Sequence, residues 1–265
     1  MDSYKTVPQW CGMKMLRFGG MKILIANDDG IYSPGIAALA KSAMKFGEVI
    51  VVAPDVEQSS MGHAVTHSKP LAIKNSPVKF PEGVEAFRVN GTPGDCVAIG
   101  THINANIDVV LSGINMGPNL GNGMWHSGTL AAAKQGVLLG FKGIAYSTTV
   151  GKSEPDFEKL APFVERTLEL LLKFDDKGLY NVNIPENPTD VKWTRQSVRF
   201  YDGIVKPGTD PFGRKHYWFN VKPVEAAEEG SDRWAFENNY VSITPLRLDL
   251  TDENRLKEMQ QKQPI

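Results

Sequence analysis

Two adjacent carboxylates, Asp28 and Asp29, stand between an apolar run and a helix-forming segment early in the chain. Residues 22–26 are typical of a buried strand, and Ser33 and Pro34 suit the N-cap and first position of a helix. Carboxylates bind hard divalent cations, and the free N–H groups of a helix N-terminus attract anions. The pattern indicates a metal ion beside a phosphate, although an Asp-Asp-Gly sequence also suits an ordinary turn.

Other polar side chains follow other predicted strands. Ser59 lies in a loop after the strand 48–53, and Asn115 comes after the strand 107–112. Ligands of parallel α/β sheets bind beyond the carboxyl ends of the strands, so these loops are expected to share one site. Two carboxylates, a hydroxyl and a carboxamide form an all-oxygen set that suits Mg²⁺ or Mn²⁺. The candidate metal ligands are Asp28, Asp29, Ser59 and Asn115.

Helix N-termini next to these loops are candidate phosphate sites. Thr92 and Ser127 suit N-caps, the first with Pro93 and Asp95 in a capping-box-like pattern. The predicted phosphate-binding residues are Asn27, Gly94, Ser127, Gly128 and Thr129. Three histidines lie on the loops of the candidate site: His63, His67 and His126. Each is either a general acid or base of the site, or a residue without a role in it.

The elements that position these residues alternate between strand and helix from residue 21 to 185. This alternation predicts a Rossmann-like, mostly parallel α/β sheet with helices on both faces. Residues 186–265 are expected to form an antiparallel hairpin extension, with an acidic, solvated loop at 224–232 and a polar helix at 251–262. Exposed hairpins of this kind can exchange between subunits, so an oligomer is expected. Residues 1–20 are predicted to be a disordered leader.

Composition narrows the class of protein. The 265 residues are 42% hydrophobic and 22% charged, with a net charge of −1 and two cysteines. The absence of a basic tract argues against a nucleic-acid partner, and the few cysteines argue against a disulfide-bonded scaffold or a zinc site. No apolar run reaches the roughly 18 residues of a membrane span. A cytoplasmic protein without a membrane partner is expected.

Several phosphate-handling classes lack their motifs here. Neither the dinucleotide fingerprint GxGxxG nor the P-loop GxxxxGK[ST] is present, and there is no GxSxG elbow for a nucleophilic serine. An aspartyl-phosphate phosphatase would want two carboxylates spaced by one residue, whereas the pair here is adjacent. That class, with Asp28 as nucleophile, and a non-catalytic nucleotide-binding module remain the two alternatives.

Five motifs, in order, closely resemble the SurE family of stationary-phase survival proteins. They are NDDG at 27–30, APD at 53–55 followed by Ser59, GTPGDCV at 91–97, SGINMGPNLG at 112–121 and SGTLAAA at 127–133. The resemblance resumes at DPFG at 210–213 with Tyr217-Trp218, and at YVSITPL at 240–246. Two positions depart from the family pattern: His126 stands where a tyrosine is frequent, and residues 236–240 lack the usual small residues.

The resemblance implies a metal-dependent 5′/3′-nucleotidase, a phosphoric monoester hydrolase. It implies a Rossmann-like core, a swapped C-terminal extension, a homodimer or homotetramer, and polyphosphate as a further substrate of some members. By motif position, Asp28, Asp29, Ser59 and Asn115 would hold one divalent ion per subunit. The sequence thus predicts phosphate removal from nucleoside 5′- and 3′-monophosphates by a metal-activated water, with Asp28 and Asp29 as the catalytic residues.

Overall fold

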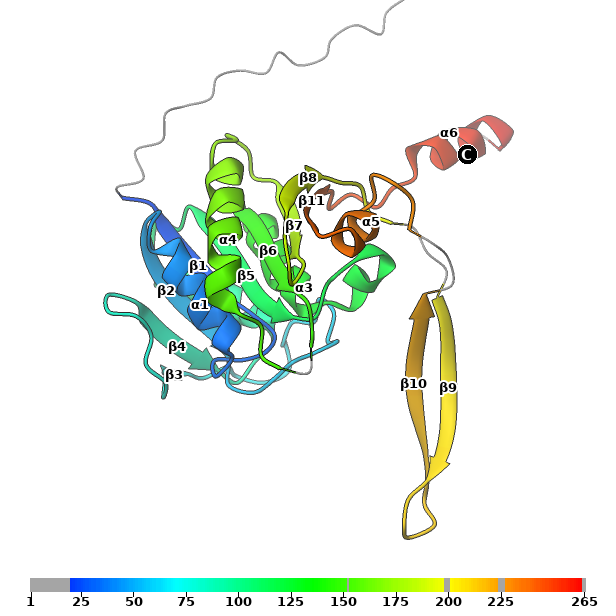
Figure 1. Cartoon of the computed structure of the whole chain (residues 1–265), viewed down its shortest axis with the longest axis horizontal. Coiled ribbons are helices and arrows are strands. Elements are labelled where there is room, and N and C mark those ends of the chain that lie inside the picture. Colours follow the sequence, from blue (N-terminus) through cyan, green and yellow to red (C-terminus); the bar gives the residue numbers. More distant parts are fainter. Residues whose placement is uncertain (1–19, 152, 198–200, 224–226, 264–265) are drawn as a thin grey trace, which may run out of the picture.

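Strand β1 (Lys22–Ala26), which leads to the two carboxylates, lies inside a nine-stranded sheet in the computed structural model of the protein (Figure 1). The structure describes residues 20–151, 153–197, 201–223 and 227–263. The leader predicted at residues 1–20 therefore lies outside the described residues, apart from Gly20.

The sheet is mostly parallel, as predicted. Its strands run in the order β3 (Ile73–Asn75), β4 (Glu85–Val89), β2 (Glu48–Pro54), β1, β5 (Val109–Met116), β6 (Lys142–Thr148), β7 (Leu179–Ile184), β11 (Tyr240–Leu246) and β8 (Asp190–Trp193). The six strands from β4 to β7 pair in parallel. The short edge strand β3 pairs antiparallel with β4, and β11 pairs antiparallel with β7.

Helices cover both faces of the sheet, which confirms the predicted fold class. Helices α1 (Pro34–Ala43) and α4 (Phe157–Leu172) pack together on one face, and α2 (Pro93–Ile103) and α3 (Gly128–Leu138) pack together on the other. The side chains of β1 alternate between two apolar clusters, with Ile23 and Ile25 in one and Leu24 and Ala26 in the other. A strand buried on both faces is apolar along its whole length for this reason.

Strand β1 is also the point at which the order of the strands in the sheet reverses. Strands β2 and β4 lie on one side of it, and β5, β6 and β7 lie on the other. In open α/β sheets, the crevice at the carboxyl ends of the two strands at such a switch point is the usual ligand site. The segments that end β1 and β5 carry Asp28, Asp29 and Asn115, so the topology itself brings these side chains together.

Asn115 lies inside β5, and not in a loop after it as predicted. The strand continues to Met116, with a register shift against β6 between Ser112 and Asn115. Gly113 has a φ of +120°, a conformation open to glycine, and it lies within this irregular stretch. The Ser-Gly sequence that suggested the end of the strand marks a bulge.

The C-terminal segment divides between the large sheet and a projecting hairpin. Strands β8 and β11 complete the sheet, whereas β9 (Tyr201–Thr209) and β10 (Lys215–Pro223) form an antiparallel pair that extends away from it (Figure 1). Helix α6 (Glu253–Lys262) has no buried residue. The domain boundary predicted at residue 185 stays a prediction.

The prediction of a solvated acidic loop at 224–232 is wrong at its end. Residues 224–226 lie outside the described part, but Ser231 caps a short helix, α5 (Asp232–Glu237), and Asp232 is fully buried. Its carboxylate accepts hydrogen bonds from the backbone N–H groups of Gly121 (2.9 Å) and Ser197 (3.0 Å). These two long-range partners, invisible in a local pattern, explain why the acid is buried.

Candidate metal and phosphate site

A cleft of about 650 Å³ opens at the carboxyl ends of β1 and β5. All four predicted metal ligands lie on its wall, although they come from three separate segments of the chain: Asp28, Asp29, Ser59 and Asn115. Ser127, one of the predicted phosphate-binding residues, lies on the same wall. The structure therefore brings these five residues to one cavity, and each is held there by contacts of its own.

Asn27 shapes the loop that presents the two carboxylates. Its carboxamide Nδ2 donates to the carbonyl of Gly30 (2.9 Å), and its Oδ1 accepts from the Gly30 N–H (3.1 Å). Gly30 has a φ of +88°, which lets the chain turn at that point. Asn27 itself is fully buried and does not line the cleft. Its predicted contact with phosphate stays a prediction, while the structure gives it a loop-closing role.

The N-terminus of α3 lies directly against Asp28. Ser127 caps the helix by accepting from the Leu130 N–H (3.0 Å), and the Thr129 hydroxyl donates to Asp28 Oδ1 (2.7 Å). A Cβ atom at Gly128 would lie 2.6 Å from the Asp28 Cβ, so only glycine permits this approach. Gly128 and the fully buried Thr129 support Asp28 from behind and do not line the cleft.

Gly94 lies at the N-terminus of α2, away from the cleft wall. It is buried, and a Cβ atom there would lie 3.3 Å from the Ala64 carbonyl oxygen and from a Val65 methyl group. The predicted cap of this helix is confirmed, because Thr92 and Asp95 form a capping box. Of the two helix N-termini considered for phosphate, only that of α3 reaches the cleft.

The loop after β2 brings Ser59 to the cleft. The Gln58 N–H donates to the carbonyl of Asp28 (2.7 Å), which joins this loop to the acidic pair. The Ser59 hydroxyl donates to Glu57 Oε1 (2.6 Å), and Ser60 next to it has a φ of +60°. Glu57 also lines the cleft, and nothing in the sequence pattern had singled it out.

Asn115 and its neighbour Met116 line the cleft at the end of β5. The Asn115 Nδ2 donates to the carbonyl of Gly117 (2.6 Å), which fixes the orientation of the carboxamide. The Met116 N–H points to Asp29 Oδ2 at 3.4 Å. The end of β5 therefore orients an amide oxygen donor and contacts one of the two carboxylates.

The two carboxylates are in an environment that disfavours their charge. Burial raises the pKa of Asp28, and hydrogen bonds from Thr129 offset only part of this effect. Burial, followed by repulsion from Asp28, raises the pKa of Asp29 to about 6. Glu57 adds further repulsion to both, and among the residues that the structure describes no positive side chain lowers the pKa of either carboxylate. A cation between the two would relieve this uncompensated charge.

The donor set fits a hard divalent cation. It offers two carboxylates, one hydroxyl and one carboxamide, all oxygen donors, with room in the cleft for water or substrate oxygens. Among the described residues, no three His, Cys, Asp or Glu side chains gather as a metal cluster. The described residues therefore do not form a metal site rich in nitrogen or sulfur ligands. Their oxygen donors suit hard ions such as Mg²⁺.

A buried polar network behind the cleft was not anticipated from the sequence. Asn119, on the cleft wall, donates from Nδ2 to Ser147 (2.8 Å) and Thr129 (3.3 Å), and its N–H donates to Asn183 Oδ1 (2.8 Å). Through Thr129 the network reaches Asp28. The available signal was the sequence of β7, LYNVNI, in which Asn181 and Asn183 interrupt a fully buried strand.

The three candidate histidines lie in different surroundings. His126 lies on the cleft wall, whereas His63 bonds to Gln135 through Nε2 (2.8 Å) and His67 is exposed on the loop 55–69. The structure thus separates one histidine at the site from two that do not line it. The sequence pattern gave no means of choosing among them.

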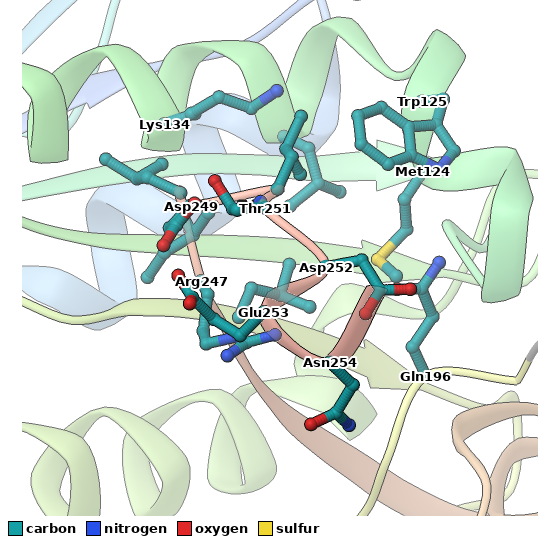
Figure 2. A pocket seen from close by; sticks show the side chains of 15 residues that line it. Met124, Trp125, Lys134, Gln196, Arg247, Asp249, Thr251, Asp252, Glu253 and Asn254 are labelled. Carbon is teal, nitrogen blue, oxygen red and sulfur yellow. Dashed lines mark hydrogen bonds between the residues drawn. The ribbon is translucent and has the colours of Figure 1, made fainter. Parts of the chain in front are cut away.

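A second cavity, of about 530 Å³, lies on the other side of the 3₁₀ segment η1 (Gly121–His126) (Figure 2). Met124 and Trp125 line this cavity, whereas Gly123 and His126 line the cleft. Its charged side chains come mainly from the C-terminal segment 247–254. Two of them are engaged locally, since Asp249 accepts from the Thr251 N–H (2.8 Å) and Asp252 caps α6.

Comparison with known proteins gives one consistent family. The family described as "Survival protein SurE" matches residues 23–203. A protein named 5′-nucleotidase SurE 1 from Thermus thermophilus is 42% identical over 245 residues, covering 90% of this chain and 96% of that protein. A protein named 5′-nucleotidase SurE from Deinococcus radiodurans is 39% identical, covering 92% and 93%.

The fold agrees with the same family. The crystal structure of the SurE protein from Aquifex aeolicus superimposes with a TM-score of 0.77 at 38% identity, covering 91% of this chain and 99% of that chain. The family match, the long alignments and the shared fold rest on different measurements and agree. The resemblance predicted from the ordered motifs is confirmed, and the chain belongs to the SurE family.

Proposed function

We propose that this protein is a divalent-metal-dependent phosphomonoesterase that removes phosphate from nucleoside 5′- and 3′-monophosphates. The observation that carries the proposal is the pair Asp28 and Asp29 at the switch point of the sheet, buried with no compensating positive charge from the described part of the chain. A helix N-terminus lies beside it. The names of the Thermus and Deinococcus relatives support a nucleotidase activity.

In this proposal, one Mg²⁺ or Mn²⁺ ion per subunit is held by two carboxylates and two neutral oxygens. The ligands are Asp28, Asp29, Ser59 and Asn115. When bound, such an ion polarises a phosphoryl oxygen and lowers the pKa of a water ligand. The residues of this chain supply the rest: they orient the phosphate, hold the water and accept its proton.

The phosphate is placed against the N-terminus of α3. Ser127 lies on the wall there, and the helix dipole and free N–H groups favour a negative ligand. An oxygen of Asp28 or Asp29 accepts the proton of the attacking water. Terminal phosphates of short polyphosphates present the same group and are a further candidate substrate.

A homodimer or homotetramer is part of the proposal. The hairpin β9–β10 projects from the sheet and exposes Phe212 (84%), Trp218 (67%) and Phe219 (69%). Large apolar side chains exposed this strongly are typical of surfaces that contact another chain. Within the part of the chain that is described, no helix is long and apolar enough to cross a membrane. We place the protein in the cytoplasm as a proposal.

The test is phosphate release from a panel of 5′- and 3′-nucleoside monophosphates, each with Mn²⁺, with Mg²⁺ and with a chelator. Wild type is compared with Asp28→Asn, which keeps the size of the side chain and removes its charge. We expect release that depends on metal and falls by about 10²–10³-fold in the variant, as for loss of an electrostatic catalytic group. Thermal unfolding of both proteins controls for folding.

Two results would replace the proposal with its alternatives. Tight nucleotide binding without release from any substrate would indicate a binding module. A phosphoenzyme trapped on Asp28 during turnover would indicate an aspartyl-phosphate phosphatase. Full metal-dependent activity in a folded Asp28→Asn protein would show that the reaction occurs elsewhere in the molecule.

A further inference from the structure

The cleft contains one basic side chain among its described lining residues, and the proposed function leaves it without a role. His126 is exposed on the wall that also holds Asp28, Asp29 and Ser127. The other titratable side chains on that wall are Asp28, Asp29, Tyr32, Glu57 and Glu154. All of the carboxylates are acceptors when ionised, so a proton donor for the reaction has few possible sources.

The backbone of His126 is fixed from several sides. Its carbonyl accepts from the Gly62 N–H (3.0 Å), and the N–H of Ser127 donates to the carbonyl of Met124 (3.2 Å). Met124 is buried, with its sulfur 3.1 Å from the Asn181 Nδ2. Figure 2 shows Met124 and Trp125 directed into the second cavity. This anchoring of η1 holds His126 at the cleft.

The start of η1 is anchored too. The Gly121 N–H donates to the buried Asp232 carboxylate (2.9 Å), and Gln196 Nε2 donates to the Gly121 carbonyl (3.2 Å). Both ends of the segment that carries His126 are therefore tied to the body of the protein. A proton donor needs such a fixed position to act on a bound substrate.

The remaining candidates for proton donation have other tasks. Asp28 and Asp29 are assigned to the cation and must be ionised for that. Glu57 accepts the hydroxyl hydrogen of Ser59. A carboxylate has no hydrogen to donate when it is ionised, and phenols as a class are much weaker acids than imidazolium ions. Histidine is the side chain that most often transfers protons near neutral pH.

Building on the proposed function, we propose that His126 is the general acid that protonates the leaving nucleoside oxygen. Water forms the new P–O bond and gives its proton to an aspartate. As the ester P–O bond breaks, its electron pair stays on the nucleoside oxygen, which takes the imidazolium proton. The products are a nucleoside and inorganic phosphate, and the neutral imidazole regains a proton from solvent through its exposed face.

The test exploits the difference between two leaving groups. A nucleoside leaves as a strongly basic alkoxide unless it is protonated, whereas p-nitrophenolate is a stable anion that needs no proton. We expect His126→Gln to lower kcat for a nucleoside monophosphate by about 100-fold, within the range of general acid catalysis. For p-nitrophenyl phosphate we expect kcat to change by less than about 3-fold, because proton donation contributes little there.

His67→Gln is the matched control, since it makes the same change at an exposed histidine that does not line the cleft. It should leave both rates unchanged. An equal loss for both substrates in His126→Gln, or no loss for the nucleotide, would overturn the assignment. If wild type releases phosphate from neither substrate, the proposed function itself fails, and the two failures are thereby distinguished.

A second measurement does not depend on turnover. The imidazole C–H resonances of His126 can be identified by NMR through their loss in His126→Gln. We expect them to shift when a non-hydrolysable phosphonate analogue of the nucleotide is titrated into the metal-loaded protein, while those of His67 stay in place. Binding of the analogue without any shift at His126 would contradict contact with the substrate.

Discussion

The cleft and the second cavity are similar in size and share η1 as a wall, yet their polar groups are organised in opposite ways. In the second cavity the charged side chains, apart from Lys134, belong to a short C-terminal segment, and Asp249 and Asp252 bond to backbone N–H groups two and three residues further along the chain. In the cleft the charges come from segments far apart in sequence, and Asp28 is almost fully buried.

This difference indicates which of the two cavities is the better candidate for a catalytic site. Locally satisfied carboxylates at a surface have ordinary partners and do not need a ligand. Carboxylates that are buried without a positive partner raise the free energy of the protein until something neutralises them. The cleft, and not the second cavity, therefore has the unfavourable charge environment that the proposed cation would relieve.

Helix α3 offers a matched pair of glycines, because Gly128 in its first turn lies against Asp28 and Gly136 in its last turn lies against Val110 of the core. In Gly128→Ala the new methyl group would lie 2.6 Å from the Asp28 Cβ. We expect a loss of about 1–3 kcal/mol in the free energy of unfolding. We also expect a fall of at least about 10-fold in metal-dependent activity, because displaced catalytic groups lose their geometry.

Gly136→Ala is the control in the same helix. There the methyl group would lie 2.7 Å from the Val110 Cβ, away from the cleft. A similar loss of stability is expected in urea unfolding, with kcat of the folded fraction unchanged. If both variants lost activity equally, the close approach of α3 to Asp28 would have no special importance for the site.

A smaller effect is expected in the pH dependence of stability of the metal-free protein, where a buried carboxylate of the cleft should differ from an exposed one elsewhere. The pKa of Asp29 rises from 3.8 to about 6 in the folded protein, so the folded state binds more protons than the unfolded state between these values. Stability should therefore fall as pH rises from about 4 to 6. Asp29→Asn removes this penalty and should be more stable by about 1–2 kcal/mol at pH 7.

The comparison uses urea unfolding with a chelator at pH 4 and pH 7. Asp175→Asn, a change at an exposed carboxylate after α4, should show no such pH-dependent gain. Added Mn²⁺ should reverse the order, because wild type binds the ion in its folded state and the Asp29 variant binds it less well. A gain that is identical at both pH values would contradict the environment described for Asp29.

Local signals in the sequence were sufficient for the framework of the site. Ser33, Thr92 and Ser127 cap the helices predicted for them, and the apolar runs around β1 and β2 are strands buried on both faces. Caps and apolar periodicity depend on neighbours within a few residues, so a single sequence contains them. The parallel topology then implied which loops meet.

Contacts between distant segments could not be predicted in the same way. The short helix α5 and the exposed three-residue strand β3 lack a periodic pattern of their own. The bond from Thr129 to Asp28 spans 101 positions, so a residue expected to bind phosphate was found to support a carboxylate. Asn27 likewise closes its own loop. Side-chain partners of this kind are decided by packing, which a local pattern does not contain.

The most direct test of a cation site in the cleft is calorimetric titration of the metal-free protein with Mn²⁺ at pH 6 and pH 7.5. We predict about one ion per chain, with more protons released at pH 6 because Asp29 is partly protonated there. Asp28→Asn should abolish the binding, and Asp252→Asn, in the second cavity, should leave it intact. Unchanged binding in a folded Asp28→Asn protein, or its loss in Asp252→Asn, would contradict the assignment of the cation to the cleft.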